Sequence, residues 1–167
     1  MSLVIRAFQQ GDAARVRKLF IVVNRLLAPA GMEAQFDSYI ERALREEIDR
    51  IADYYREGGF WVALHGERLV GTFGLEPAGA GAMELRRMYV DPSARRHGIG
   101  WQMLRYAEGE VRKKGCHRLI LSTAALQGAA IALYEKAGYR EVREEASEPG
   151  SHKTVGDIRR LHFEKHL

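Results

Sequence analysis

The stretch Arg95-Arg96-His97-Gly98-Ile99-Gly100 joins a predicted strand at 84–90 to a predicted helix at 101–114, and it determines the predicted fold. Glycines let the backbone approach a ligand closely. The first N–H groups of a helix have no partner, and the helix dipole favours an anion there. Arginine side chains add positive charge and forked donors. The stretch therefore predicts a phosphate-binding loop, with a glycine-rich turn that carries solvated arginines as the alternative.

The composition is that of a soluble globular protein with one domain. Its 167 residues are long enough for a single hydrophobic core. No apolar run approaches the roughly 20 residues of a membrane span, and charged residues interrupt the first 20 positions, where a signal peptide would lie. Cys116 is the only cysteine, which fits a reducing compartment. We therefore expect a cytoplasmic protein that has no membrane partner.

The charge pattern suits a small anionic ligand better than a nucleic acid. The net charge is +4 and the isoelectric point is near 9.3. Basic residues alternate with acidic ones at 41–47 and 143–145, whereas a polyanion-binding protein usually shows a stripe of one sign. His162 and His166 are four residues apart in a predicted strand, where they would share a face without closing around a metal ion. We expect neither a nucleic-acid partner nor a metal.

Hydrophobic periodicity predicts an α/β fold with a mixed sheet of six to seven strands and helices on both faces. The expected order is β α α β β β α β α β β, with strands at 3–8, 60–65, 68–75, 84–90, 118–123, 139–142 and 157–165 and helices at 12–28, 33–57, 101–114 and 127–137. The strand–helix–strand unit at 84–123 is expected to pair in parallel through a right-handed crossover. The last two strands should form an antiparallel pair, joined by a long polar loop.

The stretch 84–142 resembles the GNAT superfamily of acetyl-CoA-dependent N-acetyltransferases at two motifs. The family's phosphate loop is Arg/Gln-x-x-Gly-x-Gly/Ala, which residues 95–100 match. Its second signature is a helix ending in Leu-Tyr-Glu-x-x-Gly-Phe/Tyr, which residues 133–139 match. That signature usually opens with Asn seven positions before the Tyr, where this chain has Gln127. The resemblance implies a three-layer GNAT-like domain over residues 1–167, with its acetyl-CoA-binding core at about 83–142.

Two other phosphate-binding motifs do not fit the loop. A Walker loop would need Gly-Lys-Ser/Thr after the glycines, and the chain has no such tripeptide. The dinucleotide pattern Gly-x-Gly-x-x-Gly would place a glycine where Met103 stands. With these two motifs absent, the resemblance to the GNAT family implies coenzyme A as the phosphate-bearing ligand of the loop.

The resemblance implies a cofactor site along the strand at 84–90, the loop and the start of the next helix. In the family this strand carries a bulge and diverges from the next parallel strand, so its backbone pairs with the pantetheine chain. Backbone N–H groups of the loop hold the pyrophosphate, and the amide at Gln127 contacts the pantetheine. The residues expected to bind acetyl-CoA are Met88, Tyr89, Val90, Arg95, Arg96, His97, Gly98, Ile99, Gly100, Trp101 and Gln127.

Tyr134 and Glu84 are the candidate catalytic residues. Tyr134 has the position of the family's general acid, which protonates the leaving thiolate; the alternative is an aromatic side chain packed in the core. Glu84 lies eleven residues before Arg95, where some family members have their base. The alternatives for Glu84 are a solvated carboxylate paired with Arg86 or Arg87, and a water molecule as the base.

The expected reaction is transfer of an acetyl group to a primary amine of a small molecule or a protein, by direct attack in a ternary complex. The acceptor site is expected to be shaped by residues at about 12–57, 77–82 and 144–156, and acids on the second helix favour a cationic amine. A different hypothesis is a GNAT-fold module that binds coenzyme A for regulation or interaction without turnover. Family members often pair, so a homodimer is an open expectation.

Overall fold

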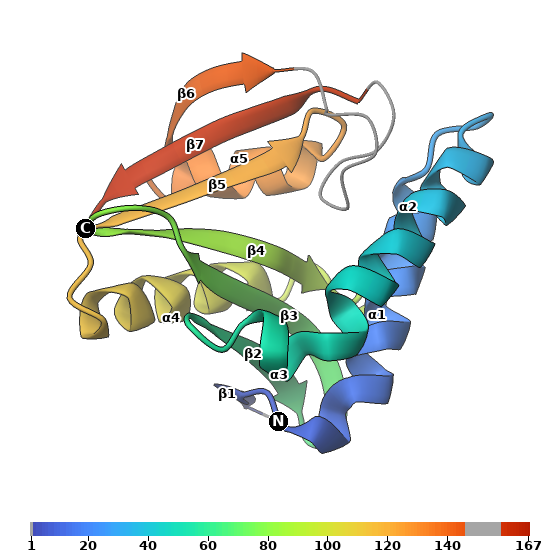
Figure 1. Cartoon of the computed structure of the whole chain (residues 1–167), viewed down its shortest axis with the longest axis horizontal. Helices are drawn as coiled ribbons and strands as arrows, with labels where there is room; N and C mark the ends of the chain where they lie inside the picture. Colours follow the sequence, from blue (N-terminus) through green and yellow to red (C-terminus); the bar gives the residue numbers. More distant parts are fainter. Residues whose placement is uncertain (1, 146–157) are drawn as a thin grey trace.

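Figure 1 shows a twisted sheet of seven strands with helices on both faces in the computed structural model. The structure describes residues 2–145 and 158–167. The strand order is β1-β2-β3-β4-β5-β7-β6, and β4 and β5 are the parallel pair within this otherwise antiparallel sheet. These findings confirm the predicted mixed α/β fold. Most of the predicted loop at 144–156 lies outside the described residues.

The elements follow the predicted order, with bounds that differ by a few residues. The strands are β1 Leu3–Ala7, β2 Gly59–His65, β3 Arg68–Pro77, β4 Ala82–Val90, β5 Arg118–Ala124, β6 Arg140–Glu145 and β7 Arg160–His166. The helices are α1 Ala13–Leu27, α2 Glu33–Glu46, α3 Ile51–Tyr54, α4 Ile99–Lys113 and α5 Gly128–Lys136. Among the described residues no helix is both long enough and apolar enough to span a bilayer.

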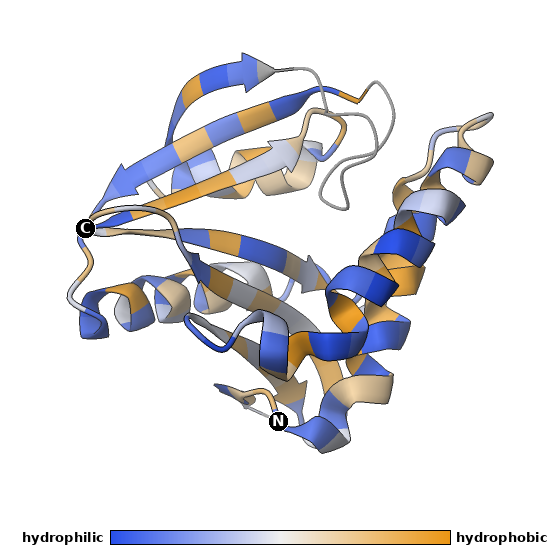
Figure 2. Ribbon diagram, in the orientation of Figure 1, coloured by the Kyte–Doolittle hydropathy of each residue, from blue (hydrophilic) through white to orange (hydrophobic). Residues whose placement is uncertain are grey.

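Two hydrophobic cores lie on the opposite faces of the sheet. Phe20 of α1 and Ile40 of α2 pack with residues of β2 on one face. Met103 of α4 and Tyr134 of α5 pack with the central strands on the other face. Figure 2 shows hydrophobic and hydrophilic residues alternating along α1 and α2, as expected for helices that bury one side. The two helical layers therefore leave the ends of β4 and β5 between them (Figure 1).

The expected single helix at 33–57 is wrong, because the backbone leaves helical geometry at Glu47. Its φ and ψ are −138° and −62°, and a 3₁₀ turn and the short α3 follow. The carboxylate of Glu47 is fully buried and binds Arg86 and Arg87 of β4. The periodicity placed Glu47 beside the apolar side of a continuous helix, whereas the break lets it reach the arginines.

The parallel strands β4 and β5 pair over only part of their length. Residues 82–85 of β4 pair with residues 118–121 of β5, and beyond them no pairing joins the two strands. In this region Arg87 has a φ of +53°, and the register with β3 shifts between Thr72 and Gly74. Such a bulge bends a strand and re-aims its side chains. The result is an opening between the ends of β4 and β5.

Candidate active site

Two hollows meet at the opening between β4 and β5. The first, here the loop groove, has a volume of about 880 Å³ and is lined by the end of β4, residues 94–96 and 98–101, and α5 with the turn before it. The second, here the arginine pocket, has a volume of about 110 Å³ and is lined by Arg86, Arg87 and Arg160 with residues of α1, α2 and β5. The residues that line both are Leu27, Met88, Tyr89, Leu126, Gln127, Ala130 and Tyr134.

The start of α4 supplies backbone donors to the loop groove. Gly98 precedes the helix with a φ of 71°, in the left-handed region that favours glycine. The first backbone hydrogen bond of the helix runs from the N–H of Gln102 to the carbonyl of Gly98, at 3.1 Å. The N–H groups of residues 99–101 therefore have no carbonyl partner within the helix. Because the helix dipole adds positive potential at this end, the groove has a seat for an anion.

The two glycines of the loop motif have different physical roles. A Cβ atom at Gly98 would meet nothing within 4 Å, so the space in front of this residue is open to a ligand. A Cβ atom at Gly100 would lie 3.1 Å from Cδ2 of Leu133 on α5. Gly98 therefore sets the backbone conformation beside the groove, whereas Gly100 allows α4 to pack closely against α5.

Cations flank the backbone donors of the loop groove. Arg95 and Arg96 are exposed and line it on one side, and Lys136 lines it from α5. The Lys136 ammonium lies 5.8 Å from the centre of the Trp101 ring. Free N–H groups, an open space before Gly98 and three cations fit a cofactor that carries several phosphates. The groove is lined by every residue predicted to bind acetyl-CoA except His97, which is exposed and lines neither hollow.

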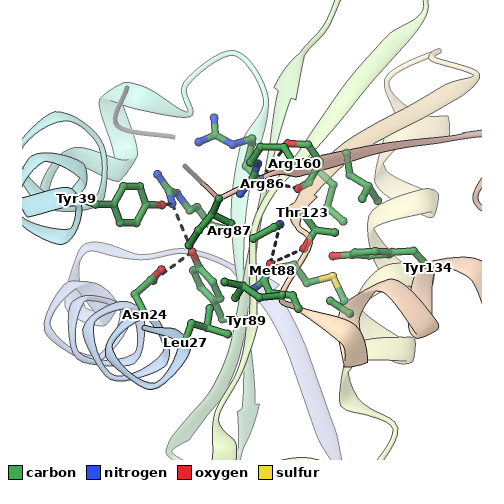
Figure 3. Close-up of a pocket in the computed structure, with 18 of the residues that line it drawn as sticks. Asn24, Leu27, Tyr39, Arg86, Arg87, Met88, Tyr89, Thr123, Tyr134 and Arg160 are labelled. Carbon is green, nitrogen blue, oxygen red and sulfur yellow. Dashed lines mark hydrogen bonds between the residues drawn. The ribbon is translucent and has the colours of Figure 1, made fainter. Parts of the chain in front are cut away.

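Tyr134 lies where the loop groove and the arginine pocket meet. Its side chain is 5% exposed, and its hydroxyl makes no hydrogen bond to any residue that the structure describes. Figure 3 shows the hydroxyl pointing into the pocket. Burial raises the pKa of Tyr134, and the neighbouring Tyr89 raises it further. The phenol therefore remains protonated at neutral pH and is available as a proton donor.

Gln127 precedes α5 and uses its amide oxygen within the protein. The oxygen accepts hydrogen bonds from the hydroxyl of Thr123 and, at 3.3 Å, from the backbone N–H of Ala124. The amide nitrogen donates to no described residue. Gln127 thus closes the turn between β5 and α5 while its NH₂ group stays available to the loop groove.

Glu84 is half-buried on β4 and lines the arginine pocket. It makes no ion pair or hydrogen bond with the side chains that the structure describes. The alternative pairing with Arg86 or Arg87 is wrong, since Arg86 binds Glu47 and Glu76, both at 3.2 Å, and Arg87 binds Glu47. Glu84 is therefore a carboxylate that lines the pocket without a partner among the described residues.

Sequence reasoning missed the buried cluster around Glu47. Its carboxylate accepts hydrogen bonds from Arg87 Nε at 2.9 Å and Nη2 at 2.8 Å, and from the hydroxyl of Tyr55 at 2.5 Å. Burial alone would raise the pKa of Glu47, but Arg87 and then Arg86 outweigh it and lower the pKa to about 2. The sequence feature that could have indicated this cluster is Glu47 beside apolar helix positions, together with the adjacent Arg86 and Arg87 in a strand. The cluster fixes both arginines in the wall of the pocket.

The described residues hold no group of three or more His, Cys, Asp or Glu side chains placed to bind a metal ion. Backbone N–H donors at the start of α4, a protonated phenol, and a carboxylate with no partner among the described side chains line two hollows that share seven residues.

Known proteins with similar sequences are N-acetyltransferases. Over 98 residues the chain is 34% identical to probable N-acetyltransferase 14 of Xenopus tropicalis, an alignment that covers 56% of this chain and 48% of the relative. Over 115 residues it is 30% identical to N-acetyltransferase 8 of Rattus norvegicus, an alignment that covers 64% of this chain and 52% of that relative. The chain thus spans about half the length of these curated relatives.

Solved structures share the fold. A GNAT-family acetyltransferase of Staphylococcus aureus Mu50 superposes with a TM-score of 0.77 at 17% identity, covering 99% of each chain. The PaiA N-acetyltransferase of Thermoplasma acidophilum, solved in complex with coenzyme A, superposes with a TM-score of 0.76 at 22% identity over the whole of both chains. The model of the acetyltransferase (GNAT) family matches residues 28–139, which is more than half of the sequence. The chain belongs to the GNAT acetyltransferase family.

Proposed function

We propose that the protein transfers the acetyl group of acetyl-CoA to a primary amine, by direct attack of the amine in a ternary complex. The observation that carries this proposal is the meeting of the loop groove and the arginine pocket at Tyr134. One hollow has the donors for a phosphate-bearing cofactor, and the other has an unpaired carboxylate for an amine. The names of the relatives, which are N-acetyltransferases, support the same reaction.

The loop groove would hold acetyl-CoA through backbone and cationic groups. The N–H groups at the start of α4 and the side chains of Arg95 and Arg96 would bind the pyrophosphate. Arg86, Tyr89 and Val90 of β4 pair with β3, and none of residues 86–90 pairs with β5. Their free backbone groups suit the amides of an extended pantetheine arm, as in strand addition. Bound acetyl-CoA would supply the thioester carbonyl that the amine attacks.

The arginine pocket would hold the amine beside that carbonyl. Glu84 would take the proton that the amine loses, directly or through a water molecule. Tyr134 would donate a proton or a hydrogen bond to the sulfur as it leaves, since burial keeps its phenol protonated. Acid and base would thus line the same pocket.

A thiol-release assay tests this function. The protein is mixed with acetyl-CoA and a panel of amines, free thiol is followed with time, and coenzyme A binding is measured separately by calorimetry. We expect thiol release that depends on both the protein and an amine. Tight binding of coenzyme A without thiol release for any amine would instead support a regulatory or interaction module.

A further inference from the structure

Arg160 begins β7 and lies in the wall of the arginine pocket (Figure 3). Its Nη2 donates hydrogen bonds to the carbonyl oxygen and to the hydroxyl oxygen of Ser122 on β5, both at 3.0 Å. These bonds fix the position of the guanidinium and use one of its nitrogens. Its Nε and Nη1 donate to no described residue. Because a guanidinium is a planar fork of five donors, it retains donors for a ligand.

Arg160 differs from its two neighbours in having no acidic partner among the residues that the structure describes. Arg86 and Arg87 are neutralised by Glu47, and Arg86 also by Glu76. No carboxylate among the described side chains lies within ion-pair distance of Arg160. Burial lowers the pKa of Arg160, Tyr39 and Tyr89 oppose this shift, and the charges of Arg87 and Arg86 act in the same direction as burial. A bound anion would relieve this unfavourable environment.

Glu84 is the complementary unpaired charge in the same pocket. In the parallel register Glu84 lies opposite Ile120 of β5, and the Arg160 guanidinium is held on Ser122, two residues further along that strand. Two strand residues span about 6.6 Å. Side chains anchored at this backbone spacing can reach an amine and a carboxylate that are attached to the same carbon. The pocket therefore has one fixed positive end and one negative end.

We propose that the acceptor is a small amino carboxylate, such as a free amino acid, whose carboxylate binds Arg160 while its amine faces Glu84 and Tyr134. This inference rests on the proposed acetyl transfer. It replaces the expectation that acids of the second helix select a simple cationic amine. Glu47, the acid that follows this helix and reaches the site, is already held by Arg86 and Arg87.

Matched acceptor pairs test the proposal in the thiol-release assay. Phenylalanine is compared with 2-phenylethylamine, and leucine with isoamylamine, so that each pair differs only in the carboxylate. Because a hydrogen-bonded charge contributes about 1.5–3 kcal/mol, we expect kcat/KM to be about 10- to 100-fold higher for the amino acid in at least one pair. Amines used as well as or better than the amino acid in every pair would overturn the proposal.

Variants at adjacent arginines locate the effect. In Arg160→Gln we expect KM for the amino acid to rise about 10- to 100-fold and the value for the matching amine to stay unchanged. Arg160→Lys, which keeps the charge, should retain part of the preference. Arg159→Gln is the control, since Arg159 is exposed and pairs with Glu144 at 2.7 Å, and it should behave as the wild type. An unchanged coenzyme A affinity shows that each variant is folded.

The outcomes separate this inference from the proposed function. Thiol release with amines but without a carboxylate preference would contradict the amino carboxylate and leave acetyl transfer standing. An equal loss for both members of a pair in Arg160→Gln would likewise contradict it. No thiol release with any acceptor, despite binding of coenzyme A, would contradict both.

Discussion

The loop groove and the arginine pocket are built in opposite ways. The groove takes half of its lining residues from one stretch, residues 88–101, and that stretch offers backbone N–H groups and exposed cations. The arginine pocket draws side chains from α1, α2, β4, β5 and β7, and its charges are largely buried. A cofactor shared by a family can be bound by a short local motif. A specific acceptor needs side chains brought together by the whole fold.

Glu47→Gln is the largest perturbation of the arginine pocket. Removing one partner of a buried ion pair leaves the arginines uncompensated, so we expect the free energy of unfolding to fall by about 3–5 kcal/mol. Urea denaturation measures this change. Glu41→Gln, at an exposed position of α2, is the matched control and should change stability by less than about 0.5 kcal/mol. In the folded fraction of Glu47→Gln, coenzyme A affinity should stay within about threefold of the wild-type value, since Glu47 and its two arginines do not line the loop groove.

The same carboxylate predicts a pH dependence of stability. The pKa of Glu47 is lowered from 4.5 to about 2 in the folded protein, so its contribution is fully present above pH 4.5. The contribution is lost as the pH falls from 4.5 toward about 2. The stability difference between wild type and Glu47→Gln should therefore shrink over this range in denaturation curves. A difference that stays constant down to pH 2 would show that the charge of Glu47 is not what stabilises the cluster.

Gly98→Val perturbs the loop groove alone. Valine at a φ of 71° is strained, and its side chain would fill the open space beside the free N–H groups. We expect coenzyme A affinity in calorimetry to fall by at least about 100-fold. Gly115→Val is the matched control, because Gly115 has a φ of 76° and open space at the other end of α4. It should lower stability without changing affinity. Retained affinity in Gly98→Val would show that this loop is not the phosphate seat.

The contrast between the two hollows also explains what the sequence could predict. The strand, loop and helix around residues 95–100 are local, so periodicity and glycine spacing predicted these elements and a phosphate-binding loop. The resemblance to the GNAT family implied the cofactor-binding residues, and all of them except His97 line the loop groove. The pocket depends on tertiary contacts. The break at Glu47, the positive φ of Arg87 and the position of Arg160 on Ser122 each require partners distant in sequence. From sequence alone, a charged side chain in an amphipathic helix or strand is assigned to the solvent-facing side, because its tertiary partners are not known.

Glu84→Gln should produce the smallest effect. The effect should appear only in the kinetics with the acceptor amine. We expect kcat/KM for the amine to fall about 10-fold, below the usual range for general bases because water can take part. Coenzyme A affinity should not change, since Glu84 does not line the loop groove. Thiol-release kinetics and calorimetry on the same preparation measure both. A weaker coenzyme A affinity with normal turnover would show that Glu84 contacts the cofactor and not the acceptor amine.

Tyr134 lines both hollows, and we propose that it acts on the leaving sulfur. Measuring kcat for thiol release and coenzyme A affinity in Tyr134→Phe tests this role. We expect kcat to fall about 100-fold with cofactor affinity nearly unchanged, since only the hydroxyl is removed. Turnover equal to that of the wild type would contradict the claim.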